Sequence, residues 1–253
     1  SLGHRGTSSV AGLCMNSATE SVATVVAASR RPSGVAVCVG TPLLYTLTPV
    51  YPAMVRIADD TGTYAKCILD PYDEELSALE RAARSEDTER EVAIQLMGRC
   101  GLRADEVSYP TRGGLNYSEA GGCWFVEVVG KDTSGGPGKR RDVWVPETVV
   151  DNIQRFVSER DRGLADPIVD VSTSTIRRWV REAARHLCET GHGGRWGEVS
   201  SHDLRRSWAT YHMVERGTDV RTMMALGGWS DYSAIEPYLD VPTEAKIGRS
   251  MSP

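Results

Sequence analysis

The chain lacks a long apolar run. Its longest mostly apolar stretch, 35–45, is interrupted by Gly40, Thr41 and Pro42, and a membrane-spanning helix needs roughly 20 apolar residues. The segment 10–28 is rich in Ala and Val, but polar residues break it up, so it does not read as a signal peptide. We therefore expect a cytoplasmic protein without a membrane span.

Closely spaced cysteines are also absent. The six cysteines lie far apart, and no two of them are separated by only two residues. Zinc ribbons and small disulfide scaffolds depend on close spacing, so we expect reduced thiols. The histidines and the cysteine between 186 and 202 do not form a complete set of well-spaced ligands, so no metal site is expected.

Lysine is scarce, with four residues against 25 arginines, and the net charge is −5. Guanidinium groups are the better bidentate phosphate ligands. A negative total therefore does not exclude a polyanionic partner, because local clusters of arginine decide the matter. The same composition fits a GC-rich genome or a high-salt cytoplasm, and it does not separate the two.

The first 69 residues differ from the rest. They carry five basic and three acidic residues, and prolines break their apolar runs. From Asp70 onward there are 24 basic and 31 acidic residues, and periodic apolar patterns begin. We therefore predict an atypical N-terminal arm over 1–69 and a separate domain over 70–253.

Apolar periodicity from residue 70 onward predicts mainly helices. Thr88 and Thr218 are the expected N-caps of two of them, and Gly227 and Gly228 end the second. The expected helices are 73–84, 88–98, 147–160, 174–189, 202–216, 218–227 and one around Tyr238, and the expected strands are 123–129 and 141–145. The predicted class is α+β, a mainly helical domain with one small antiparallel hairpin.

A histidine and an arginine stand at the start of the helix predicted from residue 202. His202 and Arg205 are three residues apart and so share a helix face, and Ser200 or Ser201 can cap the helix. A helix N-terminus attracts anions, so this end suits a phosphodiester. The alternative is a capped, solvated surface pair.

The spacing of further motifs resembles a known family. The sequence GGWSD covers 227–231, and Tyr238 follows Trp229 by nine residues. Upstream, 101–106 reads GLRADE, and Lys131 lies at the tip of the predicted hairpin. Together with the H-x-L-R sequence at 202–205, the order and spacing across about 70–253 resemble the tyrosine recombinase (phage integrase) family.

The resemblance implies DNA strand cleavage and rejoining through a 3′-phosphotyrosine, with Tyr238 as the nucleophile. The implied catalytic residues are Arg103, Lys131, His202, Arg205, Trp229 and Tyr238. Arg103 and Arg205 would stabilise the charge on the nonbridging oxygens. His202 is the nearest base for the tyrosine hydroxyl.

Four of the implied residues have rivals or alternative roles. Lys131 would protonate the leaving 5′-oxygen, with Lys139 as its competitor. Trp229 would donate its indole N–H to a nonbridging oxygen, or it would simply be part of the core. Tyr232 is the rival of Tyr238, and Arg103 could be a helix C-cap cation.

The helix predicted over 174–189 carries a stripe of arginines suited to DNA phosphates. The predicted DNA-binding residues are Arg177, Arg178, Arg181 and Arg185. A solvated charged face is the alternative.

The sequence is therefore interpreted as a site-specific recombinase or integrase. The resemblance implies that 70–253 is its catalytic domain and that the arm over 1–69 is either poorly ordered or a degenerate DNA-binding region. The expected partner is double-stranded DNA, and the protein is expected to bind it as a homotetramer that assembles on the DNA. No cofactor, metal or ATP is expected to be required. A type IB topoisomerase-like relaxing enzyme and a non-cleaving DNA-binding module remain alternatives. The target sequence, the choice among integration, excision and resolution, the host, and any accessory DNA-bending proteins are not indicated.

Overall fold

The structure, a computed structural model, describes residues 56–59, 66–130, 140–236 and 251. The chain divides into two units, Ser1–Thr48 and Pro49–Pro253, and every described residue belongs to the second. Its helices are α1 (Tyr72–Arg84), α2 (Thr88–Gly98), α3 (Glu147–Glu159), α4 (Thr173–Glu189), α5 (Ser201–Thr210) and α6 (Val220–Gly227). Its strands are β1 (Arg56–Asp59), β2 (Lys66–Ile68), β3 (Leu115–Ser118), β4 (Cys123–Val129) and β5 (Arg140–Val145).

The helix ends follow local capping chemistry. Asp87, not the predicted Thr88, caps α2 by accepting from the Glu89 N–H, and Asp219, not Thr218, caps α6 by accepting from the Thr222 N–H. In both cases the cap is a carboxylate next to the threonine in the sequence, and an anion at a helix N-terminus also interacts favourably with the helix dipole.

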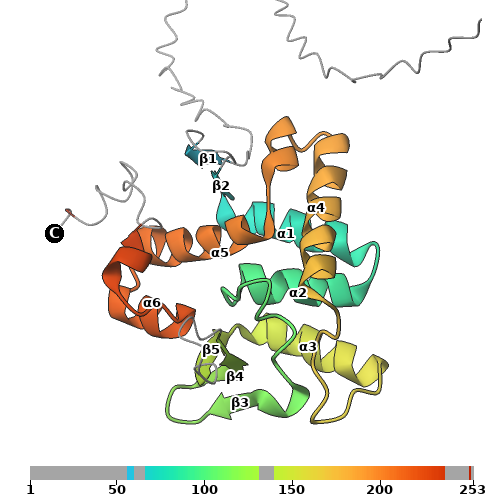
Figure 1. The fold of residues 1–253 in the computed structure, drawn as a ribbon, viewed down its shortest axis with the longest axis vertical. Coiled ribbons are helices and arrows are strands. Elements are labelled where there is room, and N and C mark those ends of the chain that lie inside the picture. Colours follow the sequence, from blue (N-terminus) through green and yellow to red (C-terminus); the bar gives the residue numbers. More distant parts are fainter. Residues whose placement is uncertain (1–55, 60–65, 131–139, 237–250, 252–253) are drawn as a thin grey trace, which may run out of the picture. The chain divides into compact units, whose positions relative to one another are not determined.

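Helix α2 is the centre of the helical part (Figure 1). It packs against α1, α3, α4 and α5, and α4 also packs on α1. The core between these helices is made of fully buried side chains, including Leu76, Leu79, Ile94, Leu96, Met97, Trp196 and Trp208. The predicted mainly helical architecture is confirmed, because each of these helices buries an apolar face against α2 or a neighbour of α2.

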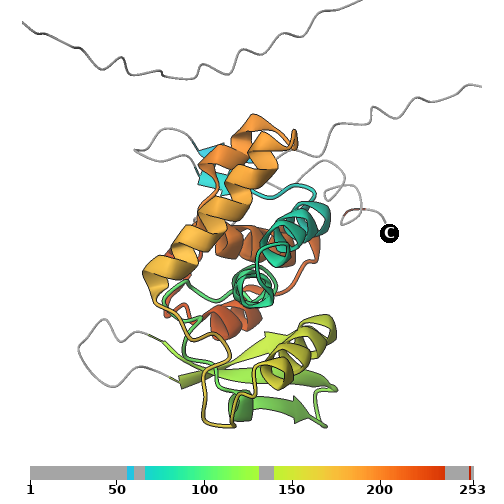
Figure 2. The same cartoon turned by 90° about the vertical axis from the view of Figure 1, so that its right-hand side faces the viewer.

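The small sheet is antiparallel and has the order β3-β4-β5. Val126 pairs with Val143 and is buried with it, while α3 covers this side of the sheet (Figure 2). The predicted hairpin is therefore confirmed, and β3 adds a third strand that the sequence did not predict. Residues 131–139, which lie between β4 and β5 in the sequence, are outside the described residues.

A second pair of strands, β1 and β2, was also not predicted. The end of β2 is tied to α5, since the Cys67 N–H donates to Asp203 Oδ1 at 3.1 Å and the Leu69 N–H donates to Ser207 Oγ at 2.9 Å. Residues just before the expected boundary at 70 therefore contact α5. The division into an arm over 1–69 and a domain over 70–253 stays a prediction.

Helix α5 continues into a π-helical turn, Tyr211–Glu215, which carries His212. The His212 ring lies 6.0 Å from the ring of Trp144 and 5.5 Å from that of Trp208. Burial lowers the pKa of His212 to about 4, the charge of Arg216 acts in the same direction, and Asp73 opposes both. The imidazole is therefore neutral in the folded protein at pH 7.

We expect acidification to destabilise the fold through His212. The unfolded chain takes up this proton near pH 6.5, whereas the folded protein resists it until about pH 4. The stabilisation is thus present above pH 6.5 and is lost as the pH falls toward 4, by about 3 kcal/mol at most. Urea unfolding at pH 7.5 and 4.5 should show a smaller loss in His212→Phe than in the wild type.

The control for this prediction is His186→Gln, because His186 is exposed on α4. This variant should lose as much stability on acidification as the wild type. Equal losses in the wild type and in His212→Phe would contradict the assignment.

Candidate functional site

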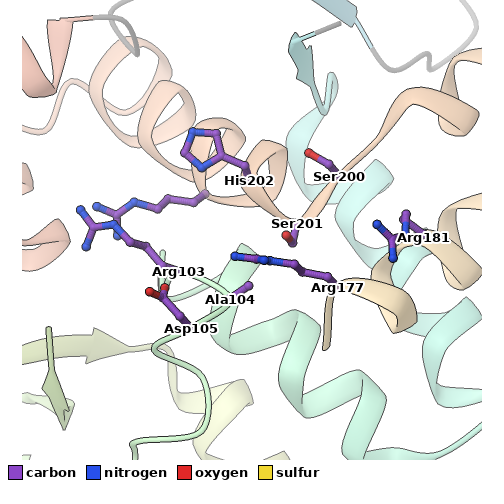
Figure 3. Close-up of a pocket in the computed structure, with 9 residues that line it drawn as sticks. Arg103, Ala104, Asp105, Arg177, Arg181, Ser200, Ser201 and His202 are labelled. Atoms are coloured by element: carbon purple, nitrogen blue, oxygen red, sulfur yellow. The ribbon is translucent and has the colours of Figure 1, made fainter. Parts of the chain in front are cut away.

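A pocket of about 480 Å³ opens at the N-terminus of α5, between the turn after α2 and helix α4 (Figure 3). Its lining residues are Arg103, Ala104, Asp105, Arg177, Arg181, Ser200, Ser201, His202 and Arg205. Asp105 is the only carboxylate among these residues. The lining is therefore strongly cationic, and the dipole of α5 adds to the positive potential.

A capping box fixes the start of α5. Both the N–H and the Oγ of Ser200 donate to Asp203 Oδ2, at 2.9 and 2.6 Å. Asp203 is almost fully buried, and its other oxygen accepts from Cys67 in β2. Both oxygens of the Asp203 carboxylate therefore accept hydrogen bonds, which fixes the first turn of α5. His202 and Arg205 face the pocket from this turn.

Arg205 is buried, with a relative exposure of 1%. Its Nη1 donates to the carbonyl of Gly101 and its Nη2 to the carbonyl of Gly227, both at 2.6 Å. Its Cζ lies 4.2 Å from the ring centroid of Trp229. These contacts fix the plane of the guanidinium, and a guanidinium has further N–H donors for an anion in the pocket.

Glu106 is buried behind the pocket and holds three arginines together. It accepts from the N–H and the Nη1 of Arg103, each at 2.8 Å. Arg141 of β5 binds both of its oxygens, with Nη1 at 3.0 Å and Nη2 at 2.8 Å, and Arg205 Nη1 lies 3.9 Å away. Glu106 therefore links the turn after α2 to the sheet and to α5.

The pKa of Glu106 reflects this environment. Burial alone would raise it, but the hydrogen bonds and charge of Arg141, followed by those of Arg103, lower the pKa below its usual value. The carboxylate is therefore ionised at neutral pH. A buried anion with this many donors is a fixed counter-charge for the arginines around it.

His202 is exposed to the pocket but is also closely surrounded by protein atoms. This desolvation lowers its pKa, the charges of Arg206, Arg205 and Arg103 lower it further, and Asp203 opposes them. The imidazole is thus neutral at pH 7, and a neutral imidazole can accept a proton.

Two glycines make room for the indole rings behind the pocket. Gly101 has a φ of +73°, and a Cβ there would overlap the ring of Trp208. A Cβ on Gly227 would overlap the ring of Trp229, which stacks on Trp208 with the ring centroids 6.2 Å apart. The carbonyls of these two glycines accept the hydrogen bonds of Arg205. The same two glycines therefore allow the indole rings to pack closely and orient the Arg205 guanidinium.

The structure brings three of the six expected catalytic residues, Arg103, His202 and Arg205, into one pocket. Trp229 does not line this pocket but packs against the guanidinium of Arg205. Lys131 and Tyr238 lie outside the described residues. Their positions, and the helix expected around Tyr238, stay predictions.

The arginine stripe on α4 is divided by the structure. Arg177 and Arg181 line the pocket, whereas Arg178 and Arg185 are exposed on the same helix but do not line it. Glu106 and Arg141 were not predicted as site residues from the sequence. Glu106 could have been noticed as the last residue of the GLRADE motif, while Arg141 had no signal of its own.

No metal-binding group is found in the part of the chain that the structure describes. Within the same residues, no helix is long and apolar enough to cross a membrane. The four described cysteines, at positions 67, 100, 123 and 188, are free thiols.

The fold and the site define an α+β protein with a cationic pocket at a helix N-terminus. Comparison with known families then identifies the group. The model of the phage integrase family matches residues 72–244, which is more than half of the chain. The chain therefore belongs to the phage integrase family.

Curated relatives agree with this assignment. Tyrosine recombinase XerD of Vibrio vulnificus is 28% identical over 163 residues, which are 60% of this chain and 48% of the relative. Tyrosine recombinase XerA of Pyrococcus furiosus is 27% identical over 161 residues, which are 60% of this chain and 50% of the relative. The chain thus spans about half the length of the curated relatives it matches.

Solved structures share the fold. The crystal structure of XerA recombinase superposes with a TM-score of 0.54 at 22% identity, over 70% of this chain and 62% of that one. The Tn1549 transposon integrase in complex with transposon right end DNA gives a TM-score of 0.56 at 18% identity, over 77% and 67%. The predicted tyrosine recombinase-like fold is confirmed.

Proposed function

We propose that this chain is a site-specific DNA recombinase or integrase that cleaves and rejoins strands through a covalent 3′-phosphotyrosine. The observation that carries the proposal is the convergence of Arg103, His202 and Arg205 on one pocket. Two guanidiniums and a neutral imidazole are the groups that attack on a phosphodiester requires. Membership of the phage integrase family supports the same chemistry.

In the proposed reaction the hydroxyl of Tyr238 attacks the scissile phosphorus. The Tyr238 oxygen–phosphorus bond forms, the bond to the 5′-oxygen breaks, and His202 takes the tyrosine proton. Lys131 gives a proton to the leaving 5′-oxygen. Arg103 and Arg205 stabilise the charge that builds on the nonbridging oxygens, and they are already oriented by Glu106 and by backbone carbonyls.

One phosphodiester replaces another in this step, so neither metal nor ATP is needed to drive it. The indole N–H of Trp229 is proposed as a further donor to a nonbridging oxygen. Its place against Arg205 supports a role in or next to the phosphate site. The catalytic domain is proposed to extend over 70–253.

Double-stranded DNA is the proposed substrate and partner. The transposon integrase that shares this fold was solved with DNA, and the exposed arginines of α4 offer this chain a cationic surface for phosphates. Recombination by this chemistry uses four active sites on two duplexes. We therefore propose a homotetramer that assembles on paired sites.

The deciding experiment is incubation of the full chain with nicked duplex DNA, in EDTA and without ATP, followed by a denaturing gel. A covalent protein–DNA band supports the proposal. Relaxation of supercoiled plasmid without exchange of strands between duplexes would favour the topoisomerase-like alternative. Tight DNA binding without any covalent band would favour the non-cleaving binding module.

We expect Arg141→Gln to slow cleavage by about tenfold to a hundredfold with little loss of DNA affinity. Arg141 binds both oxygens of Glu106 and donates its Nε to the Leu226 carbonyl at 3.1 Å. Its loss would loosen the carboxylate that positions Arg103, and small misplacements of this kind are costly. Single-turnover cleavage at saturating DNA measures the effect.

The matched control is Arg140→Gln. Arg140 is the exposed neighbour on β5 and pairs with Glu127 at the surface. It should cleave within about twofold of the wild type, because exposed ion pairs contribute little. Equal rates for Arg141→Gln and the wild type would show that Arg141 does not position the site.

A further inference from the structure

The pocket carries more positive charge than one phosphodiester needs. Arg103 and Arg205 share the Glu106 counter-charge on one side of the pocket. Arg177 and Arg181 add two more guanidiniums from α4 on the other side, where Figure 3 shows Arg177 extending toward Arg103. A single phosphodiester has one negative charge, so together with the carboxylates of Glu106 and Asp105 it does not balance the four guanidiniums, and positive charge is left for another anion.

Arg177 and Arg181 are also available to a ligand. Within the described part of the chain neither forms an ion pair with a carboxylate, whereas the next residue, Arg178, pairs with Glu182 at 3.7 Å. Both side chains are exposed, and Asp105 is the only acidic group that lines the pocket with them. Guanidiniums that outnumber the carboxylates around them are typical of an anion site.

The size of the pocket points the same way. Its volume is about 480 Å³. A phosphate group with four oxygens occupies roughly 120 Å³ if each oxygen takes the ~30 Å³ of a water molecule. The pocket can therefore accommodate more than one phosphate of a strand.

We propose that Arg177 and Arg181 form a second phosphate subsite, so that the pocket takes two consecutive phosphates of one DNA strand. The reacting phosphate lies beside Arg103, His202 and Arg205, and its neighbour lies beside α4. The identity of the ligand rests on the proposed function. Binding of the neighbouring phosphate would fix the position of the reacting phosphate. Binding energy from a part of the substrate that does not react is in this way used to orient the part that does.

The test measures binding of small ligands by calorimetry, with the full chain. The probe is thymidine 3′,5′-bisphosphate, whose two phosphates flank one nucleoside as they do in DNA, and thymidine 5′-monophosphate and 3′-monophosphate are the single-phosphate references. The bisphosphate should bind at least tenfold more tightly than either monophosphate. Equal affinities in the wild type would overturn the proposal.

Paired variants separate the subsite from general attraction to a cationic surface. In Arg177→Gln/Arg181→Gln all three ligands lose affinity, but the bisphosphate should lose the most, so that it binds within about twofold of the monophosphates. Arg178→Gln/Arg185→Gln removes the same charge from the same helix outside the pocket lining, and it should keep the advantage. An advantage that persists in the first variant, or disappears from both, would overturn the subsite.

The outcome is independent of strand cleavage. A missing covalent band would remove the proposed function but leave a measured bisphosphate advantage, and with it the subsite, in place. A covalent band without tighter binding of the bisphosphate would support the proposed function and contradict the second phosphate subsite.

Discussion

The Tyr238→Phe variant should form no covalent protein–DNA species and should still bind duplex DNA with near-native affinity. The substitution removes one oxygen, which in the proposed reaction is the nucleophile, and it keeps the ring. The loss in strand cleavage should therefore be complete within detection. Denaturing gels on nicked duplex measure the covalent species, and a mobility shift under native conditions measures affinity.

Tyr232→Phe is the matched control. Tyr232 lies six residues before Tyr238, and its exposed fraction is 54%. The variant removes a tyrosine hydroxyl, as Tyr238→Phe does, but at a nearby position. It should form the covalent band at the native rate. A band that persists in Tyr238→Phe and disappears in Tyr232→Phe would reassign the nucleophile.

The helices were predictable because each one carries its own signal. In α1 and α4, for example, apolar side chains recur at helical spacing and become the buried face. The strands β1, β2 and β3 have three or four residues each. Segments this short show too few alternations for a period to be recognised, and β2 depends on hydrogen bonds to side chains of α5, more than 130 residues away.

The site was predictable in part, for a similar reason. His202 and Arg205 lie on one turn of one helix, so local spacing is enough to pair them. The contacts of Glu106 with Arg141 and of Arg205 with the Gly101 carbonyl join residues 35 and 104 positions apart. No local pattern encodes such contacts, because they arise only when the sheet, the turn after α2 and α5 pack together.

The division of the arginine stripe shows the same limit. Helical spacing placed Arg177, Arg181 and Arg185 on one face of α4, and all three are exposed. Which of them faces the pocket depends on where the N-terminus of α5 lies against α4, and periodicity within α4 carries no information about that. Only the first two line the pocket.

Arg205→Lys should slow strand cleavage at saturating DNA by a hundredfold or more, although the positive charge is kept. Arg205 uses separate Nη atoms for the carbonyls of Gly101 and Gly227, and a single ammonium cannot reproduce that fork and also hold a phosphate oxygen. Loss of one preorganised donor to a developing oxyanion typically costs about 10²–10³ in rate. A buried carbonyl left without its donor should also lower stability by about 1–3 kcal/mol.

The rate and the stability can be measured separately. Thermal unfolding defines a temperature at which Arg205→Lys is fully folded, and single-turnover cleavage is then compared with the wild type at that temperature. Arg206→Lys is the control, since Arg206 is the next residue on α5, pairs with Asp203 and does not line the pocket. It should cleave within about threefold of the wild type. A folded Arg205→Lys protein that cleaves saturating DNA at the native rate would show that charge alone suffices, and that the fixed fork of Arg205 does not stabilise the transition state.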